Sequence, residues 1–97
     1  MSRIFYAIIP QKNYRNTKMK LRTKDYGTLN LIGKRVEALR KEQNIKQKDF
    51  ISLLQLEGLD VNPTSYSKLE GQIRIATDKE VFYIAKILNV EISELFK

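Results

Sequence analysis

Cysteine and histidine are both absent from this chain of 97 residues. Without cysteine, neither a disulfide framework nor a thiolate metal site can form. Without histidine, the chain lacks the commonest general base and the commonest metal ligand. Enzymatic chemistry would have to rest on carboxylates, lysine or tyrosine, and no pair of these residues stands in a pocket-like pattern. The composition therefore argues against an enzyme, and we expect neither a metal nor another cofactor.

A long apolar run is lacking as well. The longest one, residues 4–9, is too short to span a membrane. Pro10 and a basic polar stretch follow it, whereas a secretory signal would end in a small-residue cleavage site. Apolar residues nevertheless make up 42% of the chain, which is enough for a core, and the length suits one domain. We expect a cytoplasmic protein without a membrane anchor, a location that the absence of cysteine permits.

The net charge of +7 is unevenly distributed along the chain. Residues 1–29 hold seven bases and one acid, whereas residues 30–97 hold eleven bases and ten acids. The basicity therefore belongs to the N-terminal segment. Because residues 11–26 show neither a helical nor a strand period, we interpret residues 1–29 as a mobile arm with at most one short strand, over residues 4–9. This arm either grips phosphate or is a poorly ordered extension.

Apolar residues recur at helical spacing in the rest of the chain, which predicts an all-α domain over residues 30–97. Thr28 or Asn30 can cap the first helix, and Gly58 ends the second. Thr77 and Glu80 form a capping box at the start of the fourth. The five predicted helical segments are residues 31–42, 47–57, 63–70, 77–88 and 92–96.

The third of these segments has two unlike faces. It starts at Asn62, whose side chain can cap the helix, and at Pro63, which fits the first helical position. It ends at Gly71, the residue type best able to turn left-handed at a helix C-terminus. Tyr66 and Leu69 can point inward together. Hydroxyls and lysine on the other face can read base edges in a DNA major groove, although an ordinary solvated helix also carries such a face. The outer face consists of Pro63, Thr64, Ser67 and Lys68.

Several groups of residues stand in an order and spacing typical of one family. They are Ile32-Gly33-Lys34-Arg35-Val36 with Leu39-Arg40-Lys41, Gln47 with Phe50 and Leu54, Tyr66-Ser67-Lys68-Leu69-Glu70, Ile84-Ala85-Lys86-Ile87-Leu88-Asn89-Val90, and Glu94-Leu95-Phe96. Together they resemble the lambda-repressor and Cro-like helix-turn-helix family, the XRE-type regulators of bacteria and phages. The resemblance covers about two-thirds of the chain. It implies a compact five-helix lambda-repressor-like domain that binds double-stranded DNA near the nucleoid.

The resemblance also implies a role for each matching position. Arg40 and Glu70 match two positions that form a buried ion pair between the first and third helices. Phosphate contacts are implied at the two helix starts and after the third helix, where N–H groups and bases attract an anion. The implied base contacts are Thr64, Ser67 and Lys68. The implied phosphate contacts are Gln47, Lys48, Asn62 and Arg74.

The chain departs from the family pattern at three places. Ile51 stands where the family usually has a small residue, and Lys46 stands where it usually has a Ser or Thr cap. About four extra residues separate Gln47 from Asn62, which is close to one helical turn. We expect either a second helix extended by a turn or a longer loop through Gly58, and either would make room for Ile51.

The function implied by the resemblance is that of a sequence-specific transcriptional regulator, acting as a repressor by occupying its operator through residues 63–70. Two such helices in successive major grooves require a homodimer with half-sites about 34 Å apart. The alternative is an antitoxin of a toxin–antitoxin pair, or another protein-interaction module, which the nearly neutral helical domain favours. The candidate dimer surface, whose residues could instead thicken the core, comprises Phe82, Tyr83, Ile87 and Phe96.

Overall fold

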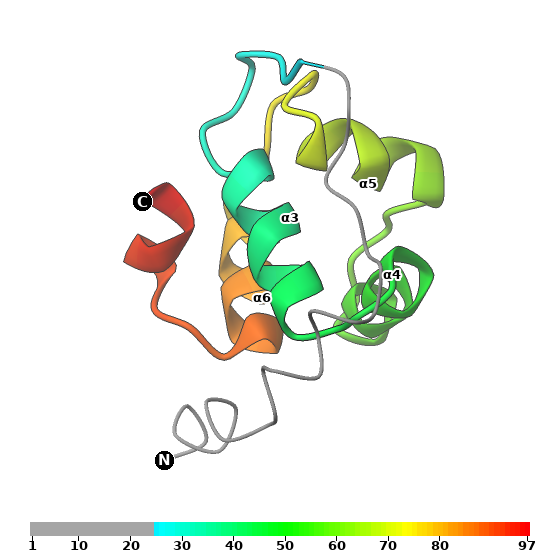
Figure 1. The fold of residues 1–97 in the computed structure, drawn as a ribbon. Helices are drawn as coiled ribbons and strands as arrows, with labels where there is room; N and C mark the ends of the chain where they lie inside the picture. The colour runs from blue at the N-terminus through cyan, green and yellow to red at the C-terminus, as the bar shows by residue number, and fades with distance from the viewer. Residues whose placement is uncertain (1–24) are drawn as a thin grey trace.

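The structure, a computed structural model, describes residues 25–97 and is entirely helical there, without a strand. The all-α prediction is therefore confirmed for this part of the chain. The arm and the short strand predicted within residues 1–24 lie outside the described residues. The elements are α3 (Gly33–Glu42), α4 (Gln47–Leu56), α5 (Pro63–Glu70), α6 (Asp78–Leu88) and the 3-10 helix η1 (Ile92–Phe96) (Figure 1).

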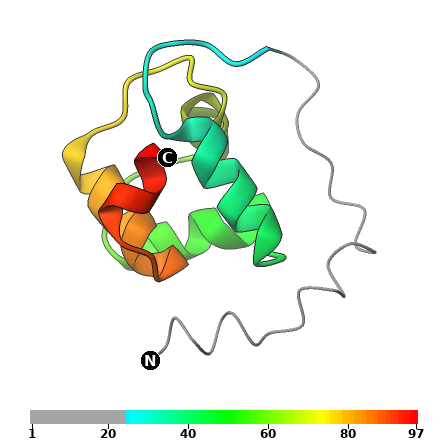
Figure 2. The same cartoon turned by 60° about the vertical axis from the view of Figure 1, so that its left-hand side comes forward.

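Helix α3 lies at the centre of the arrangement. It packs against α5, α6 and η1, while α4 packs against α5 and α6. In Figure 1, α4 and α5 lie on one side of α3 and η1 lies on the other. The turned view shows η1 alongside α6 (Figure 2). The helices therefore enclose one core, and burial of its apolar side chains is the main force that holds them together. The largest apolar side chains in this core are Ile32, Phe50, Leu54, Tyr66, Leu69, Ile84, Leu88 and Leu95.

The ends of α5 and α6 are closed by the expected caps. The Asn62 side chain accepts a hydrogen bond from the Ser65 amide at 2.8 Å, and Pro63 occupies the first turn. The capping box of Thr77 and Glu80 is present, with both reciprocal hydrogen bonds. Each cap satisfies amides that have no partner inside the helix, so these two starts are set by local sequence.

The C-terminal end of α5 differs from the expectation. Gly71 has a right-handed conformation with φ of −79°, and the left-handed residue is Gln72, with φ of 60°. Gly71 is buried, and its carbonyl accepts a hydrogen bond from the Gly27 amide at 2.8 Å. The Gln72 side chain accepts from the Lys34 amide at 2.9 Å and donates to the Gly27 carbonyl at 3.1 Å. These tertiary hydrogen bonds offset the local cost of a left-handed non-glycine residue.

The last residues of the predicted arm, residues 26–29, make hydrogen bonds to the helical part of the chain. The amides of Gly27 and Leu29 donate to the carbonyls of Gly71 and Gln72, at 2.8 and 2.9 Å. The Tyr26 hydroxyl donates to the Glu37 carboxylate on α3. Residues 26–29 are thus held by hydrogen bonds to α3 and to the turn after α5.

Helix α3 starts at Gly33, two residues later than expected, and Asn30 serves its first turn. The Asn30 side-chain oxygen accepts from the amides of Ile32 and Gly33, at 3.0 and 2.8 Å. Gly33 also lets α3 approach α5 closely, because a Cβ there would stand 2.3 Å from the Leu69 carbonyl oxygen. Any side chain at this position would push the two helices apart.

Candidate nucleic-acid interface

Helix α5 has the two unlike faces that its sequence predicts. Tyr66, Leu69 and Glu70 are buried, and the ring of Tyr66 lies 5.6 Å from the ring of Phe50 between their centroids. On the opposite face Asn62, Pro63, Thr64 and Lys68 are exposed, and Ser67 is half-buried. Two of the three implied base-contact residues, Thr64 and Lys68, are therefore accessible to a partner. This face is short, hydroxylic and positively charged at one position.

The implied ion pair between Arg40 on α3 and Glu70 on α5 is present, and the Glu70 side chain is fully buried. The Nε atom of Arg40 donates to Oε2 of Glu70 at 2.7 Å, and Nη2 donates to Oε1 at 3.1 Å. The exposed fraction of the side chain is 5% for Arg40 and 0% for Glu70. This bidentate geometry is the strongest form of carboxylate recognition by a protein side chain. It joins the central helix to the last residue of α5.

Two further donors complete the environment of the Glu70 carboxylate. Nε2 of Gln47 donates to Oε1 at 3.2 Å, and the hydroxyl of Tyr66 donates to Oε2 at 2.6 Å. Arg40 also donates through Nη1 to the Ile45 carbonyl at 2.7 Å. Burial and the adjacent Glu70 carboxylate raise the pKa of Tyr66 well above 10.0, so the hydroxyl stays protonated as a donor. Glu70 therefore ties α3, the start of α4 and α5 into one rigid unit.

The implied phosphate contacts at the start of α4 have different environments. Gln47 is half-buried, and one hydrogen of its side-chain amide is engaged with Glu70, which leaves its second hydrogen and its backbone amide for an anion at this helix start. Lys48 is exposed. Within the described chain no side chain caps α4 at Lys46. The sequence correctly placed these residues at a helix start, but it did not indicate that Gln47 braces the Glu70 carboxylate.

The guanidinium of Arg74, an implied phosphate contact, is bound to groups within the domain. Its Nε donates to the Ser65 carbonyl at 2.8 Å, and Nη1 donates to the Ile75 carbonyl at 2.8 Å. Nη1 and Nη2 also bind the two carboxylate oxygens of Glu80, at 2.9 and 2.8 Å. All three guanidinium nitrogens are therefore engaged within the domain. Burial alone would raise the pKa of Glu80, but hydrogen bonds from Arg74 and Thr77 outweigh it and lower that pKa from 4.5.

The extra residues between α4 and α5 lie in a loop rather than in the helix. Helix α4 ends at Leu56, one residue before the expected end, and Gly58 follows with a left-handed φ of 98°. The Gln55 side chain donates to the Val61 carbonyl at 2.9 Å and braces the loop. Ile51 is buried in the core, so this wider connection accommodates it as expected. The loop places Asn62 at the start of α5 with its capping geometry intact.

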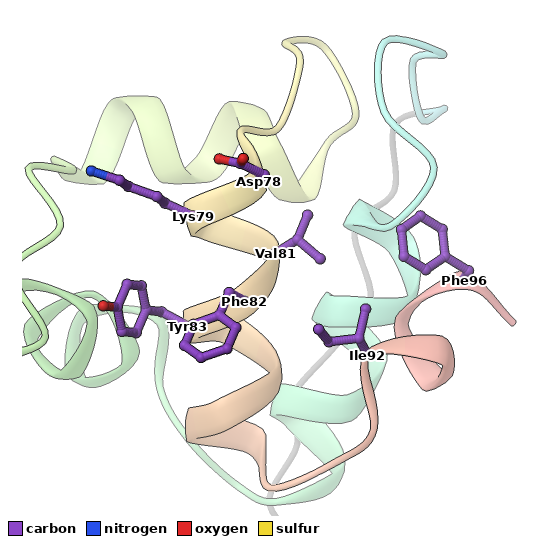
Figure 3. A pocket seen from close by; sticks show the side chains of 7 residues that line it. All are labelled: Asp78, Lys79, Val81, Phe82, Tyr83, Ile92 and Phe96. Carbon is purple, nitrogen blue, oxygen red and sulfur yellow. The ribbon is translucent and has the colours of Figure 1, made fainter.

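The residues expected to form a dimer surface are only partly gathered. Phe82 and Phe96 are 53% and 52% exposed and line an open groove of about 630 Å³ between α6 and η1 (Figure 3). Tyr83 lies beside Phe82, with an edge-to-face ring distance of 5.1 Å. Ile87 is half-buried against the core and does not line the groove. Sequence analysis missed Ile92, which lines the groove and is 43% exposed.

Sequence reasoning also missed the contacts that hold the C-terminal end of α5. The side-chain nitrogen of Asn30 donates to the carbonyls of Leu69 and Arg74, at 3.0 and 2.9 Å. Gln72 bridges residue 27 and the first turn of α3, as described above. The partners of Asn30 lie 39 and 44 residues away in sequence, so no local pattern could have indicated them.

Comparisons of the chain with family models, curated proteins and solved structures found no match. In residues 25–97, no helix is long and apolar enough to cross a membrane. The same part of the chain contains no cluster of three or more acidic residues that could hold a metal ion. A function must therefore be argued from the geometry of α5 and its surroundings.

Proposed function

We propose that the protein is a sequence-specific double-stranded DNA-binding regulator of transcription. The helical domain would be of the lambda-repressor-like helix-turn-helix type, with α4 and α5 as the two helices of the motif. Helix α5 enters the major groove, and the protein represses transcription by occupying its operator. A major groove accepts an α-helix, and lysine donates to guanine O6 and N7 while threonine offers a hydroxyl and a methyl group.

The observation that carries the proposal is the way α5 presents its outer face. Thr64 and Lys68 are exposed, whereas Glu70 on the same helix is buried and neutralised by Arg40. A free carboxylate on this helix would be repelled by phosphate, and the ion pair removes that charge from the surface. The helix is also held rigidly, which keeps its side chains in register with base edges.

The described domain does not supply a strongly positive surface around α5. Residues 46–68 contain three lysines and three acidic residues, among them the exposed Asp49 and Asp60. Residues 1–24 contain seven bases and no acid. We therefore assign the phosphate-binding contribution largely to residues 1–24, and base recognition to α5.

The proposal includes a homodimer on DNA. One eight-residue helix reads too few base pairs for an operator, and two copies would place two such helices one helical turn apart. The groove of Phe82, Ile92 and Phe96 offers an apolar surface on α6 and η1, and no residue of α5 lines it. Removal of these side chains from water would favour association of two copies.

The test is selection of bound sequences from random DNA, followed by affinity measurements on the selected site. We expect a site with two related halves about 10 base pairs apart. Lys68→Ala should weaken binding to that site by about 1–3 kcal/mol and relax the preference at one base position. Deletion of residues 1–24 should instead lower the slope of log K against log salt equally on selected and scrambled DNA. This deletion leaves the contacts of residues 26–29 in place.

A wild-type protein that enriches no sequence would refute the proposal. Unchanged binding by both Lys68→Ala and Thr64→Ala would show that α5 does not read the groove. The second candidate function is an antitoxin or another protein-interaction module, and the apolar groove between α6 and η1 is the observation that favours it. This second function predicts a protein partner that binds the Lys68→Ala variant as tightly as it binds the wild type.

A further inference from the structure

Arg74 makes a bridge between α5 and α6. Its Nε donates to the carbonyl of Ser65, in the first turn of α5, and its other two nitrogens grip both oxygens of Glu80, in the first turn of α6. The exposed fractions of the two side chains are 21% and 12%. The guanidinium thus reaches back over nine residues to the N-terminal end of the preceding helix.

The Glu80 carboxylate and the backbone of Arg74 are themselves held in place. The Glu80 carboxylate also accepts from the Thr77 amide at 2.9 Å, so the capping box holds it in place. The backbone of Arg74 is held by Asn30, whose side-chain nitrogen donates to the Arg74 carbonyl at 2.9 Å. A planar guanidinium with two parallel bonds to a carboxylate has little rotational freedom, so the bridge is stiff.

Most of the other restraints on α5 act on its buried face or near its C-terminal end. Tyr66 and Leu69 lie in the core, and Glu70 is held by Arg40. The N-terminal end of α5 carries Thr64, follows a six-residue loop, and receives a side-chain contact from α6 through Arg74. This end is also held through Val61, which is buried in the core and whose carbonyl accepts from Gln55. Arg74 adds the tie from this end of α5 to the first turn of α6.

We propose that Arg74 is a positioning residue that sets the tilt of α5, and through it the base preference of Thr64 and Lys68, without touching DNA. This inference rests on the proposed function. Helix α5 has eight residues and is about 12 Å long. A tilt of about 10° would displace one end by about 2 Å, whereas hydrogen bonds to base edges tolerate only about 0.5 Å. A small loss of restraint would therefore blur the base preference before it unfolds the domain.

The experiment compares Arg74→Gln and Arg74→Lys with a matched control, Arg35→Gln. Arg35 makes a comparable bridge, donating through Nε to the Glu94 carbonyl at 3.0 Å and through Nη2 to its carboxylate at 3.1 Å, but it joins α3 to η1. For each variant we would measure the unfolding midpoint, the amide exchange of residues 64–68 without DNA, and the ratio of affinities for the selected and scrambled sites.

Arg74→Gln should lower that affinity ratio by roughly tenfold, about the loss of one base contact, and should speed amide exchange at the start of α5. Arg74→Lys retains the positive charge but cannot bind both Glu80 oxygens in parallel, so it should keep only part of the wild-type affinity ratio. Arg35→Gln should leave the affinity ratio and the amide exchange of α5 unchanged, even if it lowers the unfolding midpoint. A lowered midpoint with an unchanged ratio in Arg74→Gln would overturn the inference while leaving the proposed function intact. A wild-type protein that shows no base preference would overturn the proposed function itself, and the inference with it.

Discussion

Replacing Arg40 by leucine should remove a large part of the stability of the domain. The Glu70 side chain is fully buried and would keep only the hydrogen bonds from Gln47 and Tyr66. Loss of one partner from a buried ion pair costs about 3–5 kcal/mol, mainly because the remaining charge is uncompensated. A domain of the size of residues 25–97 has a total free energy of unfolding of roughly 4–11 kcal/mol. The expected loss is therefore a large fraction of the total free energy of unfolding.

The assay is urea unfolding followed by circular dichroism. For an m-value near 2 kcal/mol/M, a loss of about 4 kcal/mol moves the midpoint down by about 2 M. Arg35→Leu is the matched control, because its ion pair with Glu94 is about one-third exposed at both side chains and should contribute less than about 1 kcal/mol. The double variant Arg40→Leu/Glu70→Leu should recover much of the loss, since it removes the unpaired carboxylate. An Arg40→Leu midpoint equal to that of the wild type would refute the reasoning, as would a double variant as unstable as the sum of the singles.

Two further changes test other parts of the fold. Gly33→Ala should lower the free energy of unfolding by about 2 kcal/mol, because the new Cβ would stand 2.3 Å from the Leu69 carbonyl oxygen. The measurement is thermal denaturation of this variant beside the wild type. Equal melting temperatures would contradict the close approach of α3 and α5. The lowered pKa of Glu80 predicts a contribution to stability that is fully present above pH 4.5 and is lost as the pH falls through the lower folded-state pKa. Unfolding midpoints between pH 6 and pH 2 should therefore decline less steeply for Glu80→Gln than for the wild type in the acid range, and parallel declines would exclude this carboxylate as the cause.

The helical elements could be predicted from the sequence because their signals are local. Asn62 with Pro63, and Thr77 with Glu80, satisfy amides within three residues of themselves, and both helix starts appear where these caps predict. The inward face of α5 was likewise predictable from the spacing of Tyr66 and Leu69. The implied pairing of Arg40 with Glu70 came instead from the resemblance of the chain to a family.

The environment of Arg74 could not be read in the same way. Its position after α5 gives no sign that Glu80 lies within reach, because that depends on the path of the loop between them. The left-handed residue after α5 was misplaced for a similar reason. Gly71 is the better candidate by intrinsic preference, but the outcome is decided by two hydrogen bonds of the Gln72 side chain, which donates to Gly27 and accepts from Lys34.

The amino-acid sequence by itself determined where the helices start, which faces they bury and how the charge is divided along the chain, because periodicity, caps and composition act over a few residues. The tertiary structure alone decided which polar groups meet. Glu70 gained four donors, Arg74 was drawn away from the surface to Glu80, and residues 26–29 were joined to the domain. A buried polar group must find partners wherever the folded chain brings them, and those partners lie up to 59 residues away in sequence.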